Sequence, residues 1–62
     1  MQPLRRLKAE RERSRLTQEE LAILSGVSRD AIARLETTSR RATRETTRKL
    51  ARVLKVRPQD LF

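Results

Sequence analysis

The spacing of small and apolar residues around Gly26 constrains the fold of this chain more than any other feature. Ala22 precedes Gly26 by four positions, and the branched residue Ile32 follows it by six. Glycine supplies the backbone freedom that a tight turn needs. A small residue before such a turn lets two short helices cross closely at a steep angle. The spacing therefore predicts a helix-turn-helix unit at about residues 18–36, in which the outer face of the second helix lies in solvent.

The outer face of that second helix carries Arg29, Asp30 and Arg34. A rigid helix that presents hydrogen-bonding side chains from a basic domain is suited to reading the major groove of DNA. The pattern thus points to double-stranded DNA as a partner.

Charge and size favour the same partner. The chain has 62 residues and a net charge of +8, so we expect one domain, residues 1–62, and a polyanionic ligand. A highly charged soluble surface without a target is the alternative. The charge is unevenly placed: residues 37–57 hold eight basic residues and one acidic one, whereas residues 16–36 hold two basic and four acidic ones. This division suits flanks that contact phosphates and a helix that specifies sequence.

Several residue types are absent. The chain has no Cys and no His, which removes disulfides, thiolate and imidazole metal sites and the usual acid–base residue. We therefore expect no enzyme, no metal and no cofactor, and no ligand pocket or sensing domain is evident. No apolar run approaches the length of a membrane span, and no apolar stretch follows the basic start as in a signal peptide. We expect a cytoplasmic protein, associated with the nucleoid when bound to DNA, and no membrane contact.

Capping and turn signals predict an all-α fold. Thr17-x-x-Glu20 reads as a capping box, Ser28 and Thr43 read as N-caps, and Arg15 is expected in a left-handed conformation. The predicted helices are approximately 3–15, 18–25, 28–36, 43–54 and 58–61, with a loop at 37–42. The predicted core consists of Leu4, Leu7, Leu16, Leu21, Ala22, Val27, Ile32, Leu35, Leu50, Leu54, Val56 and Leu61, with Phe62 as a cover.

Ile23 and Leu24 fit this scheme poorly. Helical periodicity would place Leu24 beside the buried Leu21, whereas the corresponding positions of the family named below are usually polar. We expect partial exposure and hypothesise a contact with a partner chain.

The sequence resembles the Cro/cI-like (Xre) helix-turn-helix family over nearly its whole length. The resemblance rests on Leu16-Thr17-Gln18-Glu19-Glu20-Leu21-Ala22, Ser25-Gly26-Val27-Ser28, Ile32, Leu35-Glu36, Leu50-Ala51, Leu54-x-Val56 and Asp60-Leu61-Phe62. It departs from the family at Thr47, where leucine is usual, and at Lys55, where glycine is common. The resemblance implies a compact five-helix, lambda-repressor-like DNA-binding domain that acts as a transcriptional regulator.

The resemblance also implies roles for individual residues. The base-reading residues would be Ser28, Arg29, Asp30 and Arg34. Arginine can grip guanine with two hydrogen bonds, and aspartate can accept one from cytosine. For the two arginines, plain phosphate contact is the alternative, and for Asp30 it is helix stabilisation or orientation of a nearby arginine. The phosphate-contacting residues would be Thr17, Gln18, Arg11, Thr37, Ser39, Arg40, Arg41 and Arg44.

Two further expectations follow from the resemblance. Arg11 and Glu36 would form a partly buried ion pair, and a homodimer contact would lie in the Val56–Phe62 region. We expect a repressor that binds a palindromic operator. An antitoxin-like protein-interaction module with DNA-binding autoregulation is the alternative. An RNA-binding or membrane-binding role is disfavoured because the chain has one aromatic residue and short, capped helices.

Overall fold

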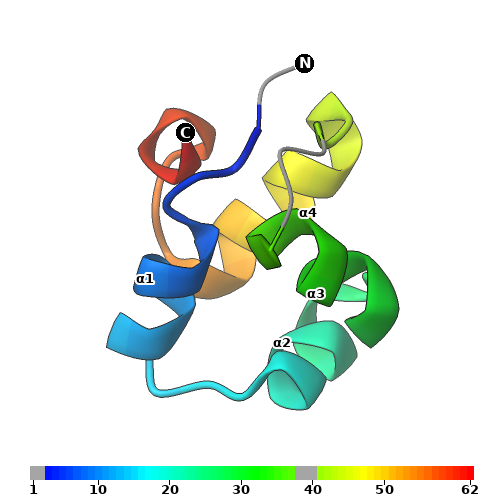
Figure 1. Cartoon of the computed structure of the whole chain (residues 1–62). Helices are drawn as coiled ribbons and strands as arrows, with labels where there is room; N and C mark the ends of the chain where they lie inside the picture. Colours follow the sequence, from blue (N-terminus) through cyan, green and yellow to red (C-terminus); the bar gives the residue numbers. More distant parts are fainter. Residues whose placement is uncertain (1–2, 38–40) are drawn as a thin grey trace.

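The described part of the chain is all-helical. The computed structural model describes residues 3–37 and 41–62. Within them lie α1 (Leu7–Arg13), α2 (Gln18–Ser25), α3 (Arg29–Thr37), α4 (Arg44–Leu54) and the 3₁₀ helix η1 (Pro58–Leu61) (Figure 1). The prediction of five α-helices is wrong for the last element, which is a single 3₁₀ turn. The N–H groups here donate to carbonyls three residues back, from Asp60 to Arg57 at 2.9 Å and from the C-cap residue Phe62 to Gln59 at 3.4 Å. None of the described helices has the length and apolarity that a bilayer-crossing segment needs.

The start of α1 differs from the prediction. Pro3 does not open a helix but forms an isolated antiparallel bridge with Arg41. The Arg6 N–H donates to the Leu61 carbonyl at 3.0 Å, and Leu4 is almost fully buried just before the turn that leads into α1. Tertiary contacts with distant residues therefore override the helical preference of this segment, and α1 begins at Leu7.

The two helices of the predicted unit are joined as the spacing around Gly26 indicates. The Thr17 hydroxyl accepts from the Glu20 N–H at 3.0 Å while the Glu20 carboxylate accepts from the Thr17 N–H at 2.8 Å, which confirms the capping box. Gly26 has φ +76° and ends α2. The Ser28 hydroxyl accepts from the Ala31 N–H at 3.1 Å and caps α3. These are local bonds, so they follow directly from the sequence.

Among residues 3–37 and 41–62, two non-glycine residues adopt the left-handed conformation. Arg15 has φ +60°, as predicted, and Lys55 has φ +58° at the end of α4. A side chain in this region costs roughly 1–2 kcal/mol, because Cβ approaches the following carbonyl oxygen. The rest of the fold sustains this strain at both positions.

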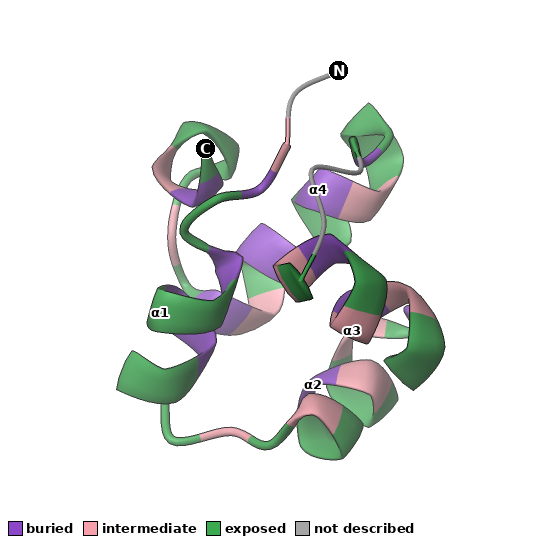
Figure 2. Cartoon of the chain, in the orientation of Figure 1, coloured by how far each residue is buried: buried purple, intermediate pink, exposed green. Residues whose placement is uncertain are grey.

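The core lies between the helices, and buried residues line their inward faces (Figure 2). α2 packs on α3 and α4, α1 on α3, and η1 on α4. The buried apolar residues are Leu4, Leu7, Leu21, Val27, Ile32, Leu35, Ala42, Leu50, Ala51, Leu54 and Leu61. Three predicted core residues, Leu16, Ala22 and Val56, are only partly buried against this cluster. Phe62 is 38% exposed at its edge.

Candidate nucleic-acid interface

The outer face of α3 carries the four predicted base-reading residues. Ser28, Arg29, Asp30 and Arg34 are all exposed. Asp30 lies one turn before Arg34, and its Oδ2 is 3.3 Å from the Arg34 Nε. This contact is compatible with the alternative role predicted for Asp30, the orientation of a nearby arginine. The ion pair lies in solvent, where such pairs contribute little, so either partner can exchange it for a base.

The N-terminus of α2 forms the second part of the surface. The N–H groups of Gln18 and Glu19 lie in the first turn, where no helix carbonyl can accept from them. A helix N-terminus of this kind attracts anions. A shallow depression joins it to the start of α3 and is lined by Arg11, Thr17, Gln18, Glu19 and Arg29. Residues predicted to contact phosphates and a residue predicted to read bases therefore share one concavity.

Arg11 and Glu36 tie α1 to the end of α3 behind this surface. The Arg11 Nε donates to Glu36 Oε2 at 2.6 Å and its Nη2 donates to Oε1 at 3.1 Å. The Arg11 Nη1 also donates to the Leu16 carbonyl at 2.7 Å, and the Gln18 Nε2 donates to Glu36 Oε1 at 3.0 Å. The Glu36 and Arg11 side chains are only 2% and 11% exposed. This cluster, Arg11–Glu36–Gln18, fixes the position of α2 relative to α3.

Hydrogen bonds within this region also set two pKa values. The hydrogen bond to Glu36 raises the pKa of Arg11, so its guanidinium stays charged. The Thr17 N–H lowers the pKa of the Glu20 carboxyl, because it stabilises the ionised form. The capping box of α2 is therefore formed at neutral pH. Arg11 is mainly a structural cation here, since most of its guanidinium faces Glu36 and Leu16.

The predicted second phosphate clamp is described in part. Arg41 and Arg44 are exposed, and the bridge to Pro3 holds the backbone at Arg41. Ser39 and Arg40 lie outside the described residues. Thr37 was expected in a loop, but it is the last residue of α3, and its hydroxyl donates to the Ala33 carbonyl at 2.8 Å. Its hydroxyl proton is thus occupied by the helix.

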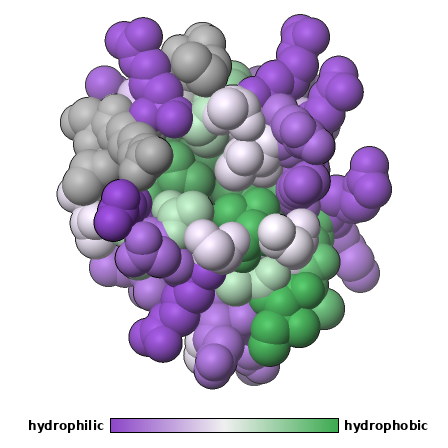
Figure 3. Space-filling model, turned by 90° about the vertical axis from the view of Figure 1, so that its right-hand side faces the viewer, coloured by the Kyte–Doolittle hydropathy of each residue, from purple (hydrophilic) through white to green (hydrophobic). Residues whose placement is uncertain are grey.

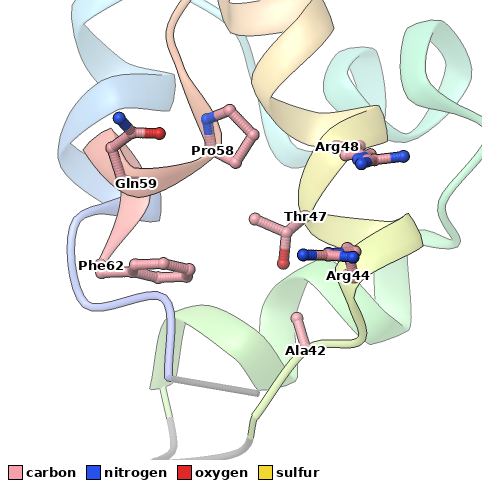
Figure 4. A pocket seen from close by; sticks show the side chains of 7 residues that line it. All are labelled: Ala42, Arg44, Thr47, Arg48, Pro58, Gln59 and Phe62. Atoms are coloured by element: carbon pink, nitrogen blue, oxygen red, sulfur yellow. The ribbon is translucent and has the colours of Figure 1, made fainter.

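The surface predicted for dimer contact surrounds a pocket between α4 and η1. Figure 4 shows the Phe62 ring on one side of it and the Thr47 and Arg44 side chains on the other. Leu61 is fully buried in the core, so it is not available to a partner. The exposed residues of η1 are Pro58 and Gln59, which line the same pocket.

Sequence reasoning missed two buried polar residues. Glu10 is 7% exposed and accepts from the Arg13 Nε at 2.9 Å, with Arg6 at 3.6 Å from its other oxygen. Thr47 is 4% exposed, and its hydroxyl donates to the Thr43 carbonyl at 2.9 Å. The spacing of Arg6, Glu10 and Arg13 at helical intervals was the available signal for the first.

A hydrophobic surface lies on α2, away from the capping end. Ile23 is 75% exposed and Leu24 is 61% exposed. Figure 3 shows strongly hydrophobic side chains gathered at one edge of the molecule beside hydrophilic ones. The expected exposure of these two residues is confirmed, and they contribute little to the core.

Comparison with known proteins identifies this architecture. The family model described as a helix-turn-helix domain matches residues 4–62. The chain belongs to the helix-turn-helix family. It is of the Cro/cI-like type that the sequence resembles. A solved structure, the restriction-modification controller protein C.AhdI from Aeromonas hydrophila, is 37% identical, with a TM-score of 0.85 over 92% of this chain and 86% of that chain. No curated protein sequence matches this helix-turn-helix chain significantly.

Membership of this family assigns the chain DNA binding and transcriptional regulation, and the family is generally not enzymatic. The helix-turn-helix unit corresponds to α2, Gly26 and α3. The exposed face of α3 and the N-terminus of α2 are therefore the candidate DNA-binding surface.

Proposed function

We propose that this helix-turn-helix protein is a sequence-specific transcriptional regulator that binds double-stranded DNA by placing α3 in the major groove. The observation that carries the proposal is the exposed, hydrogen-bonding face of α3, held beside the α2 N-terminus by the Arg11–Glu36–Gln18 cluster. Arg29 and Arg34 have the geometry to donate two hydrogen bonds to a guanine, and Asp30 can accept from cytosine. The similarity to a controller protein supports the regulatory role.

Phosphate contacts supply most of the affinity in this proposal. The α2 N-terminus, with Thr17 and Gln18, contacts one stretch of backbone, and the exposed Arg41 and Arg44 contact another. Arg40, Ser39 and Thr37 belong to the same set as sequence-based candidates. The Thr37 hydroxyl already donates its proton to the Ala33 carbonyl, so in this conformation it has no proton to donate to a phosphate.

We further propose that the protein binds a palindromic operator as a homodimer and represses transcription by occupying it. Two helices from a two-fold dimer reach successive major grooves about 34 Å apart on one face of the duplex. The contact lies in the Val56–Phe62 region. Since Leu61 is buried, the exposed Pro58, Gln59 and Phe62 are the residues that a partner subunit would meet.

Selection of bound duplexes from a random pool tests the whole proposal. We expect two copies of one short motif in inverted orientation, with their centres about one helical turn apart. A single motif without symmetry would retain DNA reading and reject the dimer. No enriched motif at moderate salt would reject sequence-specific binding.

Repression is tested separately from binding. A reporter gene whose promoter overlaps the selected motif should be expressed less when the protein is present. The matched control carries the same motif upstream of the promoter, where bound protein does not block polymerase. Increased expression from either reporter would contradict the repressor assignment and leave DNA binding intact.

The exposure of Ile23 and Leu24 favours a second candidate function, a protein-interaction module that also binds DNA. Replacing an exposed residue away from special features changes stability by less than about 0.5 kcal/mol. Ile23→Asn with Leu24→Asn should therefore leave the melting temperature unchanged and abolish a complex formed through α2. Ala9→Asn, at an exposed position of α1 outside the proposed contacts, is the control. If a co-purifying protein remains bound to the double variant, α2 is not its contact.

A further inference from the structure

A pocket of about 390 Å³ opens between the first turns of α4 and η1 (Figure 4). This volume lies within the range that small-molecule sites occupy. No such pocket is evident in the sequence, because its residues come together only where α4 packs on η1. The proposed reading surface, on α2 and α3, makes no use of this cavity.

The floor of the pocket is apolar. Ala42 and Thr47 are both buried, and Figure 4 shows the Thr47 methyl group pointing toward the side on which Phe62 lies. The Thr47 hydroxyl turns back to its own helix, where it donates to the Thr43 carbonyl at 2.9 Å. Leucine is usual at this position in the Cro/cI-like family. The smaller threonine therefore leaves space that a leucine side chain would fill.

Two rings form the wall opposite α4. Phe62 is the only aromatic residue of the chain, and it is partly exposed. Its ring lines the pocket, and the Pro58 ring lies on the same side (Figure 4). An exposed phenyl ring can stack on another planar ring. This wall therefore favours a ligand with a flat, apolar body.

The rim on the α4 side is cationic. Arg44 and Arg48 lie one turn apart on the same face of α4, and both are exposed. Among the residues that the structure describes, those that line the pocket include no carboxylate. Glu45, the nearest acidic residue in the sequence, contacts Lys49 at 3.7 Å. The rim therefore favours an anionic group on the ligand, held by charge-assisted hydrogen bonds.

We propose that this pocket binds a small, planar aromatic carboxylate, with its ring between Thr47 and Phe62 and its carboxylate at the two arginines of the rim. Phe62 also belongs to the proposed subunit contact, so an occupied pocket weakens the dimer and, with it, operator binding. The ligand is then an effector of the regulator. This effector role rests on the proposed function, whereas binding in the pocket does not.

Nuclear magnetic resonance titration of the ¹⁵N-labelled protein with 1-naphthoate tests the site. We expect saturable shifts of the Thr47, Arg48 and Gln59 N–H signals, with a dissociation constant below about 1 mM. The uncharged analogue 1-naphthamide should bind about fivefold more weakly, because it forms no ion pair with the exposed arginines. Equal affinities for the two probes, or no saturable binding of naphthoate, would overturn the proposal.

Thr47→Leu fills the pocket with the side chain that is usual in the family. The Thr43 carbonyl keeps its backbone partner, since the N–H of residue 47 donates to it at 3.0 Å. The melting temperature should therefore not fall, whereas the affinity for naphthoate should fall at least about tenfold. A folded Thr47→Leu protein with wild-type affinity would show that naphthoate binds elsewhere.

Arg48→Gln removes one cation of the rim and should weaken naphthoate binding about threefold without changing naphthamide binding. Arg52→Gln is the matched control, because it removes the same charge one turn further along α4, outside the pocket. It should keep the wild-type affinity. Equal losses in the two variants would indicate a general attraction to the basic surface and would overturn the site. This pair decides the matter even if Thr47→Leu does not fold.

The effector role is measured separately. Analytical ultracentrifugation with naphthoate should show a weaker dimer, and the affinity for the selected operator should fall in parallel. The Thr47→Leu protein should show neither change. Binding in the pocket with an unchanged dimer would retain the ligand site and overturn the effector role. If the wild-type protein forms no dimer and binds no operator, the proposed function fails while the ligand site stands.

Discussion

Two regions of this molecule carry opposite charge and are stabilised differently. Residues 16–36, the reading segment, hold two basic and four acidic residues, whereas residues 41–57, the basic segment, hold seven basic and one acidic. In the reading segment, most carboxylates have structural partners: Glu20 caps α2, Asp30 contacts Arg34, and Glu36 binds Arg11. In the basic segment, Glu45 contacts Lys49 at 3.7 Å, and the exposed arginines project into solvent.

The difference separates the source of specificity from the source of affinity. A reading helix must hold its side chains in defined positions, and internal ion pairs do this without adding net charge. Phosphate binding needs only positive charge at a suitable distance, and exposed arginines supply it. The contrast between the two segments therefore matches the division of labour in the proposed function.

The largest expected effect tests whether affinity is electrostatic. If a dimer contacts six to ten phosphates, affinity should fall about 10³–10⁵-fold between 50 and 200 mM salt. A fluorescence-anisotropy titration of a labelled operator across this range measures the slope. A flat response would show that the basic segment does not contact the DNA backbone. The excess of positive charge in that segment would then not be the source of affinity.

The second prediction concerns the Arg11–Glu36 ion pair of the reading segment. Glu36→Ala leaves the buried Arg11 guanidinium without its main partner and should cost about 3–5 kcal/mol. Thermal unfolding followed by circular dichroism measures it. Glu45→Ala is the control, because it breaks the exposed pair with Lys49 and should cost less than about 1 kcal/mol. Equal losses in the two variants would contradict the structural role assigned to the reading-segment pair.

The third prediction compares one arginine from each segment. Arg34→Ala should reduce discrimination at one base position by about 1–3 kcal/mol. Arg41→Ala should weaken all sequences equally and lower the salt slope by about one. Binding to the operator and to single-base variants of it measures both. Indistinguishable behaviour of the two variants would remove the distinction between reading and phosphate contact.

The fourth prediction compares the threonine caps of the two segments. Thr17 belongs to a reciprocal capping box, whereas Thr43 accepts from the Thr46 N–H at 3.2 Å without a carboxylate partner. Replacing either threonine with alanine should cost about 1 kcal/mol. Both melting temperatures should fall by about 4–8 °C. Thr17→Ala keeps the backbone N–H that donates to Glu20, so Glu20→Ala tests the reciprocal bond, and an unchanged melting temperature in Glu20→Ala would show that this bond adds nothing.

The smallest expected effect is on the pH dependence of stability. The pKa of Glu20 is lowered in the folded protein by the Thr17 N–H, and that of Asp60 is lowered by the Arg57 N–H. A lowered folded pKa means that stabilisation is complete above the ordinary carboxyl range and is lost as pH falls through the lower folded values. Melting temperatures measured from pH 6 to 3 should decline. Glu20→Gln should decline less steeply, and a slope identical to wild type would exclude this carboxylate as a source.

Much of the candidate surface could be predicted because its signals are local. The Thr17 box, the Ser28 cap and the turn at Gly26 each involve residues within four positions of one another. Helical periodicity then places Arg29 and Arg34 outward once Ile32 and Leu35 face the core. The left-handed conformation of Arg15 was also predictable, because Arg15 takes the position after α1 where glycine is commoner.

Other features could not be predicted because they depend on contacts between distant residues. The helical preference near Pro3 yields to a bridge with Arg41, 38 positions away. The family resemblance implied the Arg11–Glu36 ion pair, and the structure confirms it. The further bond from Arg11 to the Leu16 carbonyl, which withdraws the guanidinium from the surface, was not predicted. The extension of α3 to Thr37 is the exception, because the Thr37 hydroxyl donates to the Ala33 carbonyl only one turn back, and the predicted loop overlooked this local contact.

The sequence by itself determined the N-caps at Thr17, Ser28 and Thr43, the outward face of α3 and the uneven charge, because each depends on neighbouring residues or on composition. The tertiary structure alone decided which arginine is a structural cation and which is exposed, and where the first helix begins. The physical reason is that burial and desolvation of a charge depend on partners that the chain brings together only on folding. Arg11 and Arg15 are four positions apart in the sequence, and only the packing of α1 on α3 makes them different.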